Sequence, residues 1–174
     1  MAMELLGGKY LSEFYDPQDL KRSNREHLRG IIQTLAWVAN IDAFQHWLYE
    51  HPKHSAQERR QAWATLYEQF GGQFIDWSEL TGIKDYLWHR QLHIFEVPFY
   101  YIEYGIAQLG ALQVWLNARH NPKKALSDYK YGLSLGGSRP VGELYRAAGI
   151  SFDFSESIIK PLVEEVTREW ERLS

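Results

Sequence analysis

Apolar residues recur along most of this 174-residue chain at the spacing of one helix face, and glycine or proline residues separate the apolar segments. Segment 19–50 shows the pattern clearly, because its apolar side chains recur close to every 3.6 residues. These side chains are Leu28, Ile31, Ile32, Leu35, Val38, Ala39, Phe44, Trp47 and Leu48. No alternating apolar and polar run longer than four positions, the pattern typical of a strand, is present. The sequence therefore predicts an all-α fold, a multi-helix bundle formed by residues 1–174 as a single helical domain.

The ends of the expected helices carry capping signals. Asp16 precedes Pro17 at a first helical position, and Ser55 is followed three residues later by Glu58, which forms a capping box. The glycine-rich residues 136–140 lack the Lys-Ser/Thr ending of a phosphate-binding loop, so we interpret them as a tight turn. We expect helices over residues 2–15, 19–50, 55–70, 83–93, 98–119, 123–135 and 141–148, and one that begins at residue 155.

Segment 98–116 is apolar and long enough to span a bilayer. It carries Glu103 and two amides, Gln108 and Gln113, which are scattered around the helix. A charge inside a membrane span costs about 3 kcal/mol to insert. We therefore interpret the segment as a buried core helix and expect no membrane partner.

Composition excludes several classes of protein. A hydrophobic content of 45% and an aromatic content of 15% exclude a disordered chain. The net charge of −3 gives no field that favours nucleic acid, and the absence of cysteine excludes disulfides, thiolate nucleophiles and cysteine-based metal sites. Residues 1–6 have no basic region, and Gly7-Gly8 interrupts any signal-peptide core, so we expect a cytoplasmic protein.

The richest candidate chemistry lies in residues 93–104, which contain one histidine and three tyrosines. On a helix, Tyr101, Tyr104 and Gln108 would form one stripe, with Tyr100 beside Tyr104. A buried tyrosine hydroxyl needs a partner, so one interpretation is a core stripe whose hydroxyls bond to the backbone. The nearby Pro98 and His93 favour the other interpretation, a helix face that lines a cleft.

Two other candidate sites are weaker. His89 and His93 stand four residues apart and could hold zinc from one helix face, but Arg90 stands where a zinc peptidase needs a glutamate. No third ligand is evident nearby, which favours incidental spacing. Glu4 is a lone carboxylate among apolar neighbours, the usual pattern of a solvated helix edge.

Several motifs together resemble the C-terminal part of the zinc metallopeptidases of the thimet oligopeptidase and oligoendopeptidase F family, closest to the oligoendopeptidase F branch. The resemblance covers essentially the whole chain, and the Pro-Phe-Tyr-Tyr segment that begins at Pro98 is its most specific part. The carrying motifs are Met-Ala-Met-Glu-Leu-Leu (1–6), Asp-Ala-Phe-Gln-His-Trp (42–47), Pro-Phe-Tyr-Tyr-Ile-Glu-Tyr (98–104), Leu-Gly-Gly-Ser-Arg-Pro (135–140) and Ala-Ala-Gly-Ile-Ser-Phe (147–152).

The resemblance implies a metal site outside this sequence. In the family, a His-Glu-x-x-His helix supplies two zinc ligands and the general base, and a later glutamate supplies the third ligand. This sequence contains no His-Glu-x-x-His, so it looks like a fragment that begins just after the metal site. We expect zinc in the intact enzyme and none bound by this chain alone. Glu4 matches a family carboxylate that supports a zinc-bound histidine.

The resemblance also implies roles for the segment rich in tyrosine. His93, Tyr101 and Tyr104 match the family's hydrogen-bond donors to the scissile carbonyl, which becomes an oxyanion during hydrolysis. Tyr100 is a candidate substrate contact, because a register shifted by one residue gives it the matching position, and Gln108 is a further candidate for substrate binding. Residues 96–98 replace the glycine-rich loop of the thimet branch, which puts the hinge role of that loop in doubt here.

Two functions follow as hypotheses. The first is the substrate-cleft half of a zinc-dependent oligoendopeptidase that hydrolyses short peptides, with the remainder of the same polypeptide as its partner and no activity of its own. The second is a non-catalytic helical domain that binds a peptide or a partner helix through the same aromatics. As a fragment, the chain would expose apolar residues within 2–11 and self-associate through them.

Overall fold

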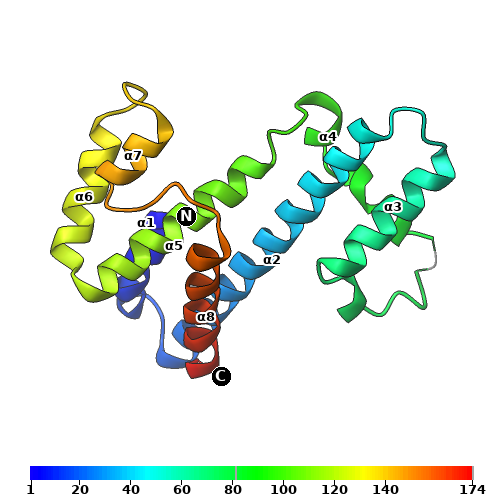
Figure 1. Ribbon diagram of the computed structural model, residues 1–174. Coiled ribbons are helices and arrows are strands. Elements are labelled where there is room, and N and C mark those ends of the chain that lie inside the picture. The colour runs from blue at the N-terminus through cyan, green and yellow to red at the C-terminus, as the bar shows by residue number, and fades with distance from the viewer. Residues whose placement is uncertain (81, 174) are drawn as a thin grey trace. The chain divides into compact units, whose positions relative to one another are not determined.

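The computed structural model describes residues 1–80 and 82–173 (Figure 1). The α-helices are α1 (Ala2–Gly7), α2 (Pro17–Glu50), α3 (Ala56–Gln69), α4 (His93–Glu96), α5 (Ile102–His120), α6 (Pro122–Ser134), α7 (Val141–Ala147) and α8 (Glu156–Arg172). Short 3-10 helices are η1 (Gly8–Glu13), η2 (Gly72–Phe74) and η3 (Lys84–Arg90). The described residues contain no strand, and the all-α prediction is confirmed.

The predicted capping signals form as expected. Asp16 accepts hydrogen bonds from the backbone N–H groups of Gln18 and Asp19, both at 2.9 Å, and Pro17 is the first residue of α2. The Ser55 hydroxyl accepts from the backbone of Glu58, and the Glu58 carboxylate accepts from the backbone of Ser55. These bonds satisfy backbone donors that a helix start otherwise leaves unpaired.

Two helix predictions near the candidate site are wrong. Residues 83–93 do not form one helix, because η3 ends at Arg90 and the extended backbone of Gln91 (φ −98°, ψ 90°) precedes α4. The helix expected from Pro98 begins instead at Ile102. Phe99 has a left-handed backbone (φ 61°), which interrupts a right-handed helix at this position.

The helices group into two compact units, which we describe separately. The central unit comprises residues 33–105, and the terminal unit comprises residues 1–32 and 106–174. The core of the central unit is aromatic: Phe44 lies between Trp63 and Trp88, with ring centroids 5.2 and 5.4 Å away. The indole of Trp63 donates to the Lys84 carbonyl at 2.8 Å, which ties η3 to α3. The buried rings and this hydrogen bond therefore hold η3, which is not part of a regular α-helix, against α3.

Close backbone contact fixes the start of α5 within the central unit. A Cβ built on Gly105 would lie 3.0 Å from a methyl carbon of Val38 in α2. Only a residue without a side chain fits this approach without a shift of its neighbour. The first turn of α5 is therefore held close to Val38 of α2.

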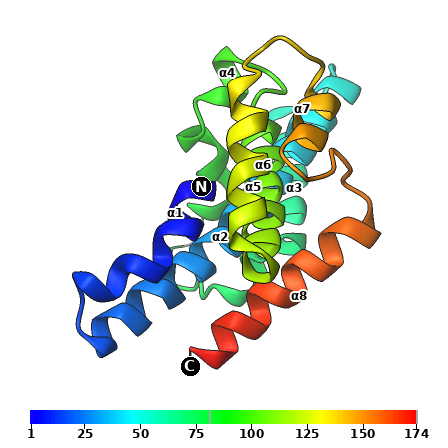
Figure 2. The same cartoon turned by 90° about the vertical axis from the view of Figure 1, so that its left-hand side faces the viewer.

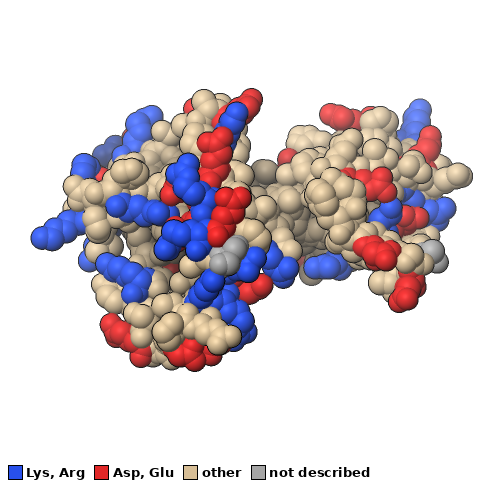
Figure 3. All heavy atoms as spheres, turned by 90° about the horizontal axis from the view of Figure 1, so that it is seen from below, with Lys and Arg blue, Asp and Glu red and all other residues tan. Residues whose placement is uncertain are grey.

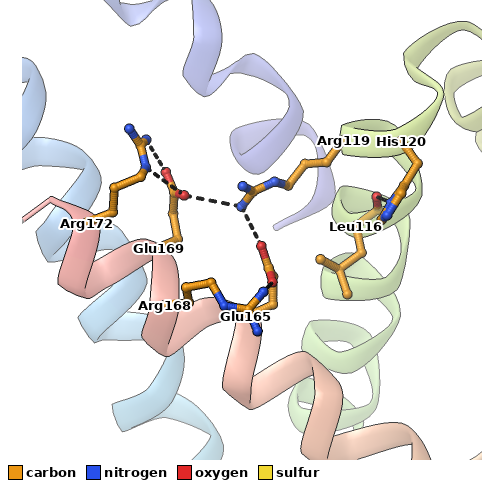
Figure 4. A network of polar contacts seen from close by, with 7 residues as sticks. All are labelled: Leu116, Arg119, His120, Glu165, Arg168, Glu169 and Arg172. Atoms are coloured by element: carbon orange, nitrogen blue, oxygen red, sulfur yellow. Dashed lines mark hydrogen bonds and ion pairs between the residues drawn. The ribbon is translucent and has the colours of Figure 1, made fainter.

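The terminal unit combines an apolar core with a polar network between helices. Its buried residues include Leu28, Ile31, Leu112, Val114, Leu162 and Val166. Arg119 of α5 lies 3.1 Å from Glu165 and 3.3 Å from Glu169 of α8 (Figure 4). Hydrogen bonds from Arg172, together with the charge of Arg119, lower the pKa of Glu169. Helices α6 and α7 pack against each other (Figure 2).

No helix in the described part of the chain is long and apolar enough to cross a membrane. On the face shown in Figure 3, acidic and basic side chains lie beside one another. Ion pairs between described residues include Lys84–Glu68 and Lys124–Asp128.

The capping box of α3 gives a stability prediction with a control inside the same chain. We expect Ser55→Ala to lower the free energy of unfolding by about 1 kcal/mol, because it removes the cap bond to Glu58. Ser155 stands at the same position before α8, but its side chain makes no cap hydrogen bond. Urea unfolding followed by circular dichroism measures both variants. Equal losses of unfolding free energy in Ser55→Ala and Ser155→Ala would contradict a stabilising role of the Ser55 cap.

Candidate functional site

Four side chains of residues 93–104 come together in the central unit, and we call them the histidine–tyrosine cluster: His93, Tyr100, Tyr101 and Tyr104. His93 is the first residue of α4, and Tyr104 lies in the first turn of α5. Tyr100 and Tyr101 stand in the turn between these helices, so the single helical stripe expected for the tyrosines does not form. The folded turn brings them to His93 instead.

The ring of His93 contacts all three tyrosine rings. Its centroid lies 6.1 Å from Tyr100, 4.9 Å from Tyr101 and 5.6 Å from Tyr104. The ring of Tyr104 also lies 5.1 Å from Tyr101 and 6.2 Å from Tyr100. One imidazole and three phenols, all able to donate hydrogen bonds, therefore share one small region.

The cluster is neither fully buried nor fully exposed. Tyr104 and Tyr100 are 38% and 46% exposed, whereas Tyr101 and His93 are half-buried. Burial raises the pKa of the Tyr101 phenol, and the nearby indole N–H of Trp37 opposes that rise. Tyr101 consequently stays a neutral hydrogen-bond donor throughout the physiological pH range.

Trp37 and Gln91, neither of which stands out in the sequence, connect the cluster to helix α2. The indole Nε1 of Trp37 donates to Oε1 of Gln91 at 3.0 Å, and Nε2 of Gln91 lies 2.7 Å from Nδ1 of His93. On the other side of the imidazole, Nε2 of His93 lies 3.4 Å from the Tyr104 oxygen. Trp37 and Gln91 are 54 positions apart, so spacing along the chain gives no signal of this contact.

Phe99 holds the turn in its unusual conformation. Among the described residues other than glycine, only Phe99 has a positive φ. Its ring lies 5.0 Å from the ring of His46 and 5.0 Å from that of Tyr49, both on α2. A left-handed backbone at a bulky residue is costly and persists where side-chain packing fixes it. These two contacts supply that packing beside the cluster.

Gln108 and Glu4, the remaining predicted site residues, lie in the terminal unit. Gln108 is buried, at 5% exposure, and its amide nitrogen has no hydrogen-bond partner. The Glu4 carboxylate lies 2.7 Å from the backbone nitrogen of Met1. Glu4 also lines a hollow of about 710 Å³ together with Leu5, Trp115 and Leu126. Their roles toward substrate and metal stay predictions.

The alternative zinc pair does not have the geometry that its spacing suggested. His89 lies in η3 and His93 in α4, and the extended backbone of Gln91 separates these elements. The His89 ring lies 4.0 Å from the ring of Trp88, and the two planes are nearly perpendicular. The described residues contain no group of three or more His, Cys, Asp or Glu side chains that could hold a metal ion.

The burial of Tyr101 gives a prediction on pH. In ¹³C NMR of the chain labelled at tyrosine Cζ, we expect the Tyr101 signal to titrate above pH 10, the ordinary value of about 10 for a free phenol. Because the folded-state pKa is raised, the neutral phenol stabilises the fold below pH ~10, and this contribution is lost as the pH rises through the raised pKa. Tyr101→Phe identifies the signal, and a titration midpoint at or below pH 10 would contradict the raised pKa of Tyr101.

Comparisons with known proteins agree with this architecture. The sequence matches the model of peptidase family M3 over residues 1–164. A solved structure of a protein assigned as an oligoendopeptidase F is 30% identical, with a TM-score of 0.86 over 98% of this chain and 30% of that chain. PZ peptidase A, solved with an inhibitor, is 30% identical, with a TM-score of 0.83 over 96% of this chain and 30% of that one.

A third structure, assigned as an oligoendopeptidase F from Bacillus anthracis strain Ames, is 29% identical with a TM-score of 0.73 and covers 98% of this chain and 27% of that chain. No curated protein matches the sequence. In each of the three comparisons with solved structures, this chain spans less than a third of the relative's length. The resemblance to oligoendopeptidase F is confirmed, and the chain belongs to peptidase family M3.

Proposed function

We propose that the intact protein is a cytoplasmic, zinc-dependent oligoendopeptidase that hydrolyses short peptides. In this proposal, the histidine–tyrosine cluster forms part of one wall of the substrate cleft. Membership of peptidase family M3 supports a metallopeptidase, and the similarity to oligoendopeptidase F supports peptide substrates.

The observation that carries the proposal is the clustering of His93 with three tyrosines in a partly exposed position. When water attacks an amide, negative charge develops on the carbonyl oxygen, and donors fixed in advance around that oxygen stabilise the transition state. In this proposal, the Tyr104 hydroxyl and the His93 imidazole donate to such an oxygen. Tyr101, half-buried and in contact with both other rings, is the third proposed donor, and Tyr100 is exposed enough to contact the peptide.

The zinc of the proposed enzyme does not fit the side chains described here. No group of His, Cys, Asp or Glu large enough to hold a metal ion forms within residues 1–80 and 82–173. We therefore place the zinc ligands and the general base in another part of the intact polypeptide and expect this chain alone to be inactive. Glu4 is proposed to support a zinc-bound histidine of that other part.

Removal of one donor tests the proposal. In the intact enzyme, we expect Tyr104→Phe to lower kcat by ~10² or more, because a donor to the developing oxyanion is lost. KM should change little, since this interaction strengthens only in the transition state. Steady-state hydrolysis of a fluorogenic peptide measures both constants.

Tyr131→Phe is the matched control, because Tyr131 is a 58% exposed tyrosine of α6 in the terminal unit. It should leave both constants unchanged. An unchanged kcat in Tyr104→Phe would remove Tyr104 from the mechanism. A raised KM with constant kcat would instead indicate a surface that only binds peptide.

A further inference from the structure

Three hydrogen-bonding contacts run in series from helix α2 to the exposed edge of the histidine–tyrosine cluster. They join Trp37 Nε1 to Gln91 Oε1 at 3.0 Å, Gln91 Nε2 to His93 Nδ1 at 2.7 Å, and His93 Nε2 to Tyr104 Oη at 3.4 Å. Because Trp37 can only donate a hydrogen bond, it determines which atoms of Gln91 and His93 donate and which accept.

An indole N–H can only donate, so the atom of Gln91 that faces Trp37 must be the amide oxygen. The amide nitrogen of Gln91 then faces His93, and this nitrogen can also only donate. Rotation of the amide by 180° would place two donors against each other at Trp37. The orientation of Gln91 is therefore fixed by the indole rather than by the imidazole.

We infer that Gln91, oriented by Trp37, holds His93 as the neutral tautomer with its proton on Nε2. Nδ1 of His93 lies 2.7 Å from a donor and must use its lone pair, so the single proton of the neutral ring is on the opposite nitrogen. Gln91 and Trp37 are thus positioning residues for the cluster. This inference deepens the proposed function and rests on it for its catalytic consequence.

The tautomer decides what the cluster offers to a substrate. With the proton on Nε2, His93 is a donor, and the Tyr104 oxygen accepts from it across the long 3.4 Å contact. The Tyr104 hydroxyl proton is then free to point away from His93. With the opposite tautomer, Nε2 would accept the Tyr104 proton, and neither group would offer a donor to a carbonyl oxygen. Because the 3.4 Å contact is long, a bound carbonyl oxygen can replace the Tyr104 oxygen as the acceptor of the Nε2–H, so Gln91 keeps two donors available where the opposite tautomer would leave none.

Neighbouring side chains hold Trp37 and Gln91, the first two residues of the series, in place. The Trp37 ring contacts Trp63 at 5.7 Å and Tyr67 at 6.3 Å between centroids, so the indole cannot swing away without loss of core packing. The guanidinium of Arg90 lies over the Trp37 ring, 5.0 Å from its centroid. Gln91 itself is half-buried and has the extended backbone that ends η3.

The tautomer is measured directly by long-range ¹H–¹⁵N NMR of the chain labelled in its histidine rings. At pH 8, above the ordinary imidazole pKa of about 6.5, a protonated nitrogen and a lone-pair nitrogen give separate ¹⁵N shifts. His93→Gln identifies the signals of His93. We expect Nε2 of His93 to be protonated and Nδ1 to carry the lone pair, and a proton on Nδ1 in the unmodified chain would overturn the inference.

Substitutions of Gln91 and Trp37 test whether these residues set the tautomer of His93. In Gln91→Glu, the carboxylate can only accept, so Nδ1 of His93 should become protonated. In Trp37→Phe, the Gln91 amide is free to rotate, and a mixture of tautomers should appear. Gln113→Glu is the matched control, because the Gln113 amide bonds to the Ser151 backbone in the terminal unit. It should leave the His93 signals unchanged.

A lone-pair Nδ1 that persists in Gln91→Glu would overturn the role of Gln91. If Gln91→Glu does not fold, Gln91→Met removes the donor without adding a charge, and an unchanged Nε2–H population in that variant overturns the inference equally. Dispersed backbone amide spectra establish that each variant is folded.

Activity separates this inference from the proposed function. In the intact enzyme, Gln91→Glu should lower kcat at least about tenfold with little change in KM, as for a histidine held in the wrong tautomer. A reversed tautomer with unchanged kcat would contradict the donor role of His93 and leave the tautomer assignment standing. A loss of kcat in Tyr104→Phe without any tautomer change in Gln91→Glu would overturn only the inference about Gln91.

Discussion

One tryptophan, Trp37, connects the aromatic core of the central unit to its candidate site. Its ring packs nearly perpendicular to those of Trp63 and Tyr67 of α3, and its only polar atom donates to Gln91. The segment from Lys84 to Tyr101 contains only short 3-10 and α-helical pieces, so its own hydrogen bonds hold it weakly. Its position depends on buried rings and on the indole bonds of Trp37 and Trp63. The polar geometry of the cluster therefore follows from packing several residues away.

Local signals in the sequence were enough to predict the regular helices. Asp16 and Ser55 each begin a helix through side-chain bonds to nearby backbone, and such bonds depend only on neighbours in sequence. The start of α5 could not be predicted in this way. Pro98 favours a helix start, but the contacts of Phe99 with two rings of α2 hold that residue in a left-handed conformation. Local preference gave way to tertiary packing there.

The same distinction applies to the candidate site. His93 and the three tyrosines of the cluster are close in sequence, so their association could be predicted. The helical stripe expected for the tyrosines does not form, because a turn stands in place of the first part of the helix. Gln91 stood inside a segment expected to be helical, where a glutamine has no special meaning. Its role becomes visible only because the helix breaks there and turns its amide between Trp37 and His93. Amide hydrolysis is accelerated by donors fixed in advance around the developing oxyanion.

The central claim is that His93 and Tyr104 donate hydrogen bonds to the reacting carbonyl oxygen of a bound peptide. A crystal structure of the intact enzyme with a phosphinic peptide, whose tetrahedral phosphorus stands for the attacked carbonyl carbon, tests this most directly. The account predicts a phosphinyl oxygen at roughly 2.7–3.1 Å from Tyr104 Oη or His93 Nε2. A bound phosphinic peptide whose oxygens contact neither group would contradict it.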